Sequence, residues 1–148
     1  MHSSGVVLAG GAGNRMGADK RFLQLGDKPL LLWTVERLRP LVDEMVLAVL
    51  DATLFAGWPV RLATDRYPGY GVLAGMHAGL TAARSEWAVV VGGDMPLLNA
   101  ALIEAMLRLA STTDVDVIVP EWRGELEPLH AVYRTTVCAR AAEAMLQA

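Results

Sequence analysis

The sequence has 148 residues, of which 53% are hydrophobic and 20% charged, and its formal net charge is -3. This length and composition fit one domain with a sizeable apolar core and exclude intrinsic disorder as the main state. The acidic balance offers no basic field that would hold a nucleic-acid backbone. We therefore expect no nucleic-acid partner, and any phosphorylated ligand should be small and locally bound.

Cysteine and histidine are too sparse for the sites they usually build. Cys138 is a single cysteine and cannot form an internal disulfide, and the histidines His2, His77 and His130 are too far apart for a zinc motif. No apolar run reaches the roughly 20 residues of a membrane helix. We expect a cytoplasmic protein that does not span a membrane, with His77 as a polar surface residue.

Short apolar segments alternate with longer helical patterns along the chain. Several of the apolar segments are rich in valine and lack period-2 alternation, which is typical of parallel strands covered on both faces. The pattern predicts an α/β fold, specifically a three-layer α/β/α sandwich with a mostly parallel sheet. The predicted strands are residues 5–9, 44–50, 60–64, 87–92, 115–120 and 129–133.

Four helices are predicted between these strands and at the end of the chain. The first begins at Pro29, where a missing N–H is tolerated, and ends near Pro40. A second runs from Leu73, and a third follows Asn99, whose side chain suits an N-cap. The last starts at about Thr136 and runs into the end of the chain.

The segment after the first predicted strand is rich in glycine and carries two cations. It reads LAGGAGNRMGADK over residues 8–20, so that backbone N–H groups can approach a ligand while Arg15 and Lys20 bring positive charge. The pattern favours a phosphate-binding loop, with a flexible connection as the alternative. A dinucleotide fingerprint needs glycine at Met16, and a P-loop needs a hydroxyl where Arg21 stands, so neither fits.

This loop closely resembles the signature of molybdenum cofactor guanylyltransferases, L-A-G-G-x-x-x-R-M-G-x-D-K, whereas relatives that use CTP begin with L-A-A-G. The resemblance implies a Rossmann-like nucleotidyltransferase fold with GTP and molybdopterin cofactor as substrates. It places Lys20 against the triphosphate and makes Arg15 and Lys20 catalytic. The backbone groups that it implies at the nucleotide are those of Leu8, Ala9, Gly10 and Gly11.

A second segment resembles the family's aspartate followed by G-P-L-A-G, with Val72 standing at the proline position. The resemblance implies that this segment binds the nucleotide through Asp65, Gly71, Leu73 and Gly75. Further along the predicted helix, Gly79 and Ala82 are small and face one side. That side can approach either a base or a neighbouring strand.

A third segment places Asp94 just past the end of a buried strand, followed by Met95 and Pro96. Open α/β sheets bind ligands at this position, and a carboxylate suits Mg²⁺ that bridges phosphates. The family carries the same D-x-P and uses its aspartate to hold Mg²⁺, which implies that Asp94 is a catalytic, nucleotide-binding metal ligand. A capping or turn aspartate is the alternative.

A fourth segment, residues 127–133, resembles the family's [QE]-P-L-x-A-x-Y and implies that Pro128 and His130 lie on the acceptor side. His130 lying in a strand without a ligand is the alternative. Two features depart from the family. The usual asparagine near the second strand is replaced by an apolar stretch with Asp51 as the nearest polar group, and the late N-x-N-T-x-x-[DE] segment is absent before Ala148.

The sequence therefore predicts a single nucleotidyltransferase domain over residues 1–148 that lacks the family's C-terminal segment. Its expected reaction is transfer of GMP from GTP to the phosphate of molybdenum-molybdopterin, with Mg²⁺ as cofactor and pyrophosphate as by-product. Molybdoenzymes or their chaperones are the implied protein partners. The alternatives are a cytidylyl or sugar-phosphate nucleotidyltransferase, a nucleotide-binding adaptor without turnover, and a redox protein, against which the missing third glycine argues.

Overall fold

The structure is a computed structural model that describes residues 2–10 and 22–148. Its helices are α1 (Leu30–Leu38), α2 (Gly71–Ala82), α3 (Ala100–Thr112) and α4 (Thr135–Gln147), with short 3-10 helices η3 (Arg39–Leu41) and η4 (Ala52–Phe55). Its strands are β1 (Ser3–Leu8), β2 (Gln24–Leu25), β3 (Lys28–Pro29), β4 (Glu44–Val49), β5 (Arg61–Thr64), β6 (Trp87–Gly92), β7 (Val117–Ile118), β8 (Glu121–Trp122), β9 (Glu125–Leu126) and β10 (His130–Arg134).

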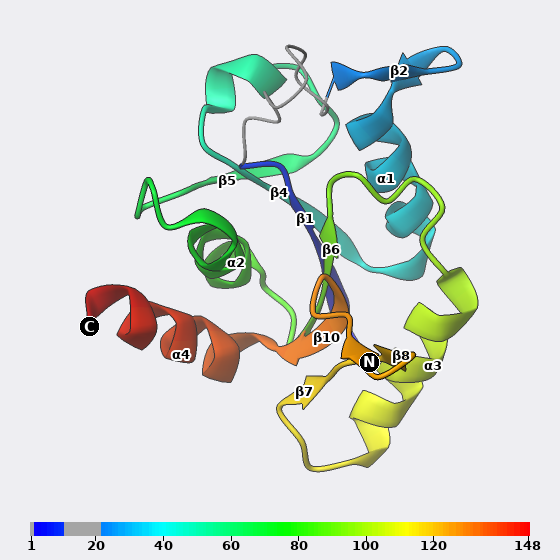
Figure 1. Cartoon of the computed structure of the whole chain (residues 1–148), viewed down its shortest axis with the longest axis vertical. Helices are drawn as coiled ribbons and strands as arrows, with labels where there is room; N and C mark the ends of the chain where they lie inside the picture. Colours follow the sequence, from blue (N-terminus) through cyan, green and yellow to red (C-terminus); the bar gives the residue numbers. More distant parts are fainter. Residues whose placement is uncertain (1, 11–21) are drawn as a thin grey trace.

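A six-stranded sheet in the order β5-β4-β1-β6-β10-β7 forms the centre of the molecule (Figure 1). Strands β5, β4, β1 and β6 run parallel, whereas β10 is antiparallel to both β6 and β7. Parallel neighbours need a crossover of about a dozen residues or more, and α1 and α2 supply such crossovers. The chain from β7 to β10 contains no helix, only the small β8–β9 hairpin, and accordingly returns antiparallel.

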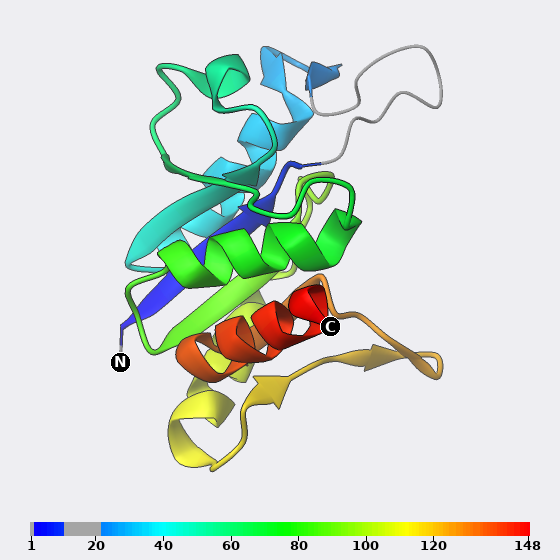
Figure 2. The ribbon, with the colours of Figure 1, turned by 90° about the vertical axis from the view of Figure 1, so that its left-hand side faces the viewer.

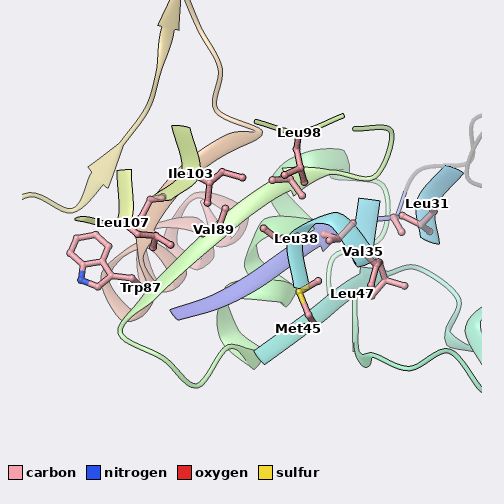
Figure 3. Close-up of a cluster of buried hydrophobic side chains, with 14 of the residues drawn as sticks. Leu31, Val35, Leu38, Met45, Leu47, Trp87, Val89, Leu98, Ile103 and Leu107 are labelled. Atoms are coloured by element: carbon pink, nitrogen blue, oxygen red, sulfur yellow. The ribbon is translucent and has the colours of Figure 1, made fainter. Parts of the chain in front are cut away.

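Helices cover both faces of this sheet, so the predicted three-layer α/β/α fold is confirmed (Figure 2). Successive strand residues point to opposite faces: Val7 packs with α1 and α3, while Val6 packs with α2 and α4. Figure 3 shows the first of these two cores. Every residue of β6 is buried, as expected for a strand that is covered on both sides.

The predicted helix boundaries agree closely with the structure. Pro29 is the N-cap of α1, and the chain tightens into η3 around Pro40. The Asn99 side chain accepts a hydrogen bond from the Leu102 N–H at 3.0 Å, so the predicted N-cap of α3 is confirmed. The two hairpins β2–β3 and β8–β9 were not predicted, because each of their strands has only two residues and lacks a readable period.

One glycine sets how closely α2 lies on the sheet. A Cβ atom built at Gly79 would stand 2.3 Å from the Cγ1 atom of Val6 in β1, far inside contact distance. Ala82 packs against the same core. Of the two roles left open by the sequence, these small residues therefore take the structural one, which is close approach of a helix to a neighbouring strand.

Candidate functional site

The carboxyl ends of β1, β4, β5 and β6 meet at one edge of the sheet, and the candidate residues follow them. Strand β1 connects through α1 to β4 on one side, whereas its other neighbour is β6. The chain therefore changes direction between β1 and β6, and open α/β sheets bind ligands at such a point. Gly10 leaves β1 on one side of this crevice, and Asp94 follows β6 on the other.

Only the first three residues of the glycine-rich loop fall within the described residues. Leu8 is half-buried, Ala9 is buried with its N–H donating to the Ala48 carbonyl at 2.8 Å, and Gly10 is half-buried. The predicted site residues Gly11, Arg15 and Lys20 lie outside the described residues. Their placement at the nucleotide stays a prediction.

An aromatic cluster lies where the chain emerges from this loop. Phe22 stacks on Phe55 with ring centroids 5.6 Å apart, and Trp58 packs edge-on against both rings. Phe55 is almost fully buried, and Phe22 and Trp58 are partly buried against the same core. Phe22, which follows the loop in the sequence, is thus anchored to the core.

The Asp65 segment follows β5 at the same edge. The Asp65 N–H donates to the Val49 carbonyl at 2.9 Å, and its carboxylate accepts from the Tyr67 N–H at 2.7 Å, which closes a turn. Gly71 begins α2 and is exposed, and Leu73 is half-buried. A Cβ at Gly75 would lie 3.6 Å from the Leu8 side chain, so the first turns of α2 stand beside the end of β1.

Asp94 lies on the loop that joins β6 to α3, and its side chain is exposed. Within residues 2–10 and 22–148, its carboxylate takes part in no hydrogen bond or ion pair. Gly93, next to it, lets β6 approach β1, because a Cβ there would stand 2.6 Å from the Leu8 carbonyl oxygen. The carboxylate is therefore held beside the start of the glycine-rich loop and is available to a ligand.

The carboxylate at this edge is compatible with a divalent metal ion that is held together with substrate phosphates. No group of three or more His, Cys, Asp or Glu side chains that could hold a metal ion occurs among the residues that the structure describes. Magnesium commonly binds through one or two carboxylates together with substrate phosphates and waters, and does not need such a cage. A single exposed carboxylate such as Asp94 is compatible with that mode.

Pro128 and His130 reach the same edge through β10. The Gly92 N–H donates to the Leu129 carbonyl at 3.2 Å, which ties this segment to the end of β6. Pro128 is exposed, whereas His130 is only 6% exposed and its Nε2 accepts from the Asn99 N–H at 3.1 Å. The acceptor-side role of both residues stays a prediction, but the His130 ring already has a partner within the protein.

Two further polar residues, Asp51 and His77, take structural positions. The Asp51 carboxylate accepts from the Thr53 N–H at 3.0 Å as the N-cap of η4. His77 is 1% exposed, so its prediction as a surface residue is wrong. It sits between Ala74 and Ala78 on the buried side of α2, a position that helical spacing could have revealed.

The sequence did not predict two residues on α1 that hold the Asp94 loop. The Thr34 hydroxyl donates to the Gly93 carbonyl at 3.1 Å, and the Arg37 guanidinium donates to the Leu98 carbonyl at 3.3 Å. A signal for Thr34 existed, since it lies on the apolar face formed by Leu31, Val35 and Leu38. A polar residue on such a face needs a partner.

The rest of the described chain gives no sign of a membrane segment: among its helices, none has the length and apolarity needed to cross a bilayer.

Comparison with known proteins identifies the family. A family model described as the MobA-like NTP transferase domain matches residues 5–148. A probable molybdenum cofactor guanylyltransferase from Chloroflexus aggregans is 37% identical over 94% of this chain, and one from Peptoclostridium acidaminophilum is 33% identical over 93%. This chain spans 69% and 64% of the length of these two relatives, respectively.

A solved structure agrees with the sequence relatives. The molybdopterin-guanine dinucleotide biosynthesis protein A from Archaeoglobus fulgidus superimposes with a TM-score of 0.80 at 28% identity, over 97% of this chain and 73% of that protein. The resemblance that the glycine-rich loop indicated is thus confirmed. This chain belongs to the MobA-like NTP transferase family, among relatives named as molybdenum cofactor guanylyltransferases.

Proposed function

We propose that the protein transfers GMP from GTP to the phosphate of molybdenum-molybdopterin, giving the guanine dinucleotide cofactor and pyrophosphate. The observation that carries this proposal is the exposed Asp94 carboxylate, held beside the start of the glycine-rich loop where β1 and β6 end. The names of the family relatives supply the substrates. Cytoplasmic location is part of the proposal and rests on the single cysteine and the substrates.

The nucleotide would lie across the carboxyl ends of β1 and β5. Backbone groups of residues 8–11 would face it on one side, and Asp65, Gly71, Leu73 and Gly75 would bind the nucleoside on the other. The half-buried state of Leu8, Gly10 and Leu73 is compatible with this placement. The N-terminus of α2, where helical N–H groups are unpaired, adds a favourable end of a helix dipole.

The reaction is an in-line attack on the α-phosphorus. An oxygen of the acceptor phosphate forms the new P–O bond, the bond from the α-phosphorus to the bridging oxygen breaks, and pyrophosphate leaves. The acceptor phosphate is already anionic at neutral pH, so no general base is needed and no covalent enzyme intermediate forms. The protein's task is alignment and neutralisation of charge.

Arg15, Lys20 and Asp94 would share that task. Arg15 and Lys20 neutralise the triphosphate directly, and Asp94 would hold Mg²⁺. When bound, the metal ion would neutralise phosphate oxygens and orient the leaving group. Pro128 and His130 would border the acceptor, and the product would pass to molybdoenzymes or their chaperones.

The decisive experiment supplies the chain with Mg²⁺, molybdopterin cofactor and each NTP in turn, and measures pyrophosphate and dinucleotide. We expect GTP to be the only NTP that gives both products. Turnover with CTP in place of GTP would make the protein a cytidylyltransferase. Binding of GTP without pyrophosphate release would make it a nucleotide-binding adaptor.

The triphosphate contact is tested by replacing Lys20 with alanine. A charge-assisted hydrogen bond contributes about 1.5–3 kcal/mol. Lys20→Ala should therefore lower the affinity for GTP by roughly 10- to 150-fold and leave guanosine binding nearly unchanged. Calorimetric titrations of the parent and the variant with each ligand measure the difference. Equal losses for the two ligands would show that Lys20 acts on folding and does not contact phosphate.

A further inference from the structure

The loop that carries Asp94 is fastened at both ends by side chains from other elements. At its start, the buried Thr34 hydroxyl of α1 donates to the Gly93 carbonyl. At its end, the Asn99 N–H donates to the Nε2 atom of His130 at the beginning of β10. Between them, Leu98 is 2% exposed and its N–H donates to the Met95 carbonyl at 3.3 Å. The exposed carboxylate is therefore carried by a loop whose two ends are bonded to other elements.

The bond to His130 requires one particular tautomer of a neutral ring. A backbone N–H can only be accepted by an imidazole nitrogen that carries no proton, so Nε2 is bare and a neutral ring has its proton on Nδ1. His130 is 94% buried by the strands around it, and its backbone pairs with Val91 of β6. The ring is thus held by the sheet and is a rigid acceptor for the loop.

Asn99 connects this acceptor to α3. Its side chain accepts from the Leu102 N–H and its carbonyl accepts from the Ile103 N–H, so one residue closes the first turn of the helix. Its own N–H points the other way, to His130. Without that acceptor, a partly buried N–H would lack its partner, and the start of α3 would be free to shift together with the loop.

We propose that His130 is a positioning residue for Asp94: its Nε2 holds the end of the Gly93–Asn99 loop, and thereby the carboxylate, against the end of β6. The inference rests on the proposed role of Asp94 in binding a metal ion and phosphate. It gives His130 a task that differs from direct contact with the acceptor. Groups that orient a metal ligand through its supporting bonds commonly change metal affinity by about 10- to 100-fold when they are removed.

The test compares two replacements of similar size. His130→Gln can place its Oε1 near the position of Nε2 and so keep an acceptor, whereas His130→Leu removes it. In the ligand-free protein, hydrogen exchange of the backbone N–H of Asn99 should be faster in His130→Leu than in the parent. In His130→Gln its rate should be close to that of the parent. In the presence of Mn²⁺ as a probe, GTP binding should weaken about tenfold in His130→Leu and recover in His130→Gln.

Each outcome decides the proposal. Unchanged exchange in His130→Leu would show that the ring does not hold the loop, and faster exchange with unchanged Mn²⁺–GTP binding would reduce the bond to a purely structural role. Should His130→Leu fail to fold, His130→Asn, whose oxygen is too short to reach Asn99, takes its place beside His130→Gln. If the parent itself binds no Mn²⁺–GTP, the proposed function fails and the positioning role fails with it, although the exchange data still report on the tether.

Discussion

The two edges of the sheet use the same kinds of charged residue in opposite ways. At the edge formed by the amino ends of the parallel strands (the amino edge), the Glu44 carboxylate accepts hydrogen bonds from the Ser4 hydroxyl, the Arg84 N–H and the Arg61 guanidinium. At the carboxyl edge, Asp94 is exposed and, in the part of the chain that the structure describes, it has no such partner. One carboxylate is used to join strands, and the other is left for a ligand.

Arg134, also at the amino edge, follows the same rule as Glu44. It donates to Asp116 at 3.0 Å and to Glu86 at 2.8 Å, and its guanidinium lies 4.5 Å from the centre of the Trp87 ring. The polar side chains near Asp94 behave differently, because Thr34 and His130 bond to the backbone of the loop and leave its carboxylate alone. At the amino edge, charged side chains are paired with one another and stabilise the fold. At the carboxyl edge, a carboxylate without a partner among the described residues lies on a loop with bonded ends, which is the arrangement expected of a ligand site.

The strongest test of this contrast removes the charge of Asp94. Asp94→Asn should leave the folded structure intact but lower transfer by about 10³-fold or more, since a metal ion supplies several kcal/mol of charge stabilisation in the transition state. Turnover and the thermal midpoint are measured together. Asp114→Asn, at an exposed carboxylate of the amino edge, is the control and should keep full activity. Parent-like turnover in Asp94→Asn would remove the metal assignment.

The opposite change is expected at Glu44. Glu44→Ala leaves three partners without their acceptor and should lower the free energy of unfolding by about 2–3 kcal/mol, while turnover per folded molecule is kept. Glu36→Ala breaks the exposed ion pair with Lys28 and should cost at most about 0.5 kcal/mol. Chemical denaturation of both variants measures the difference. Similar losses of unfolding free energy in the two variants would show that the Glu44 hydrogen bonds stabilise the fold no more than an exposed ion pair does.

The same group gives the stability a pH dependence. Burial alone would raise the pKa of Glu44, but hydrogen bonds from Ser4, the Arg84 N–H and Arg61, together with the Arg61 charge, outweigh it and lower the pKa. The stabilisation is therefore complete above the ordinary glutamate pKa of about 4.3 and is lost as pH falls through the lowered value of the folded protein. Unfolding titrations over this acidic range should show a smaller pH dependence in Glu44→Ala than in the parent.

Between the two edges, the packing of α2 is tested at Gly79. In an open helix, glycine to alanine adds up to about 1 kcal/mol of stability. Here the new Cβ would meet Val6 at 2.3 Å, so we expect a net loss of about 1–2 kcal/mol. Adding Val6→Ala should cost less in the Gly79→Ala background than in the parent, which a double-mutant cycle measures. Stabilisation by Gly79→Ala alone would show that helix and strand are not in close contact.

The sequence predicted most of the fold because its signals are local. Short apolar segments place the four parallel strands, Pro29 starts α1, and the Asn99 side chain caps α3. The direction of β10 could not be predicted in this way, since valine content does not distinguish a parallel neighbour from an antiparallel one. It depends on the absence of a crossover helix between residues 118 and 130.

The sequence predicts which loops form the candidate site, but it does not predict the hydrogen bonds that hold these loops in place. Asp94 follows from its place after a buried strand. The bond from Asn99 to His130 spans 31 residues and links two elements that are far apart in sequence, so no local pattern encodes it. His77 is a different case, because helical spacing already places it beside the buried Ala74 and Ala78, and only its neighbour on α4, Glu143 at 3.8 Å, is hidden from a local pattern.

The smallest expected effect concerns the base and lies at the carboxyl edge. Gly10→Ala copies the L-A-A-G form that the family resemblance assigns to CTP-using relatives. If the loop reads guanine through backbone groups, the added methyl group should disturb them, and unpaired polar groups cost more than a poor apolar fit. We expect GTP binding to weaken by about fivefold, about 1 kcal/mol, with little change for CTP. Titration of both nucleotides with Mg²⁺ measures the ratio. Gly13→Ala, the same substitution at a position that the signature leaves open, should not change it. An unchanged ratio in Gly10→Ala would mean that base selection rests on the segment from Asp65 to Gly75, which would then be the part of this edge that distinguishes guanine from cytosine.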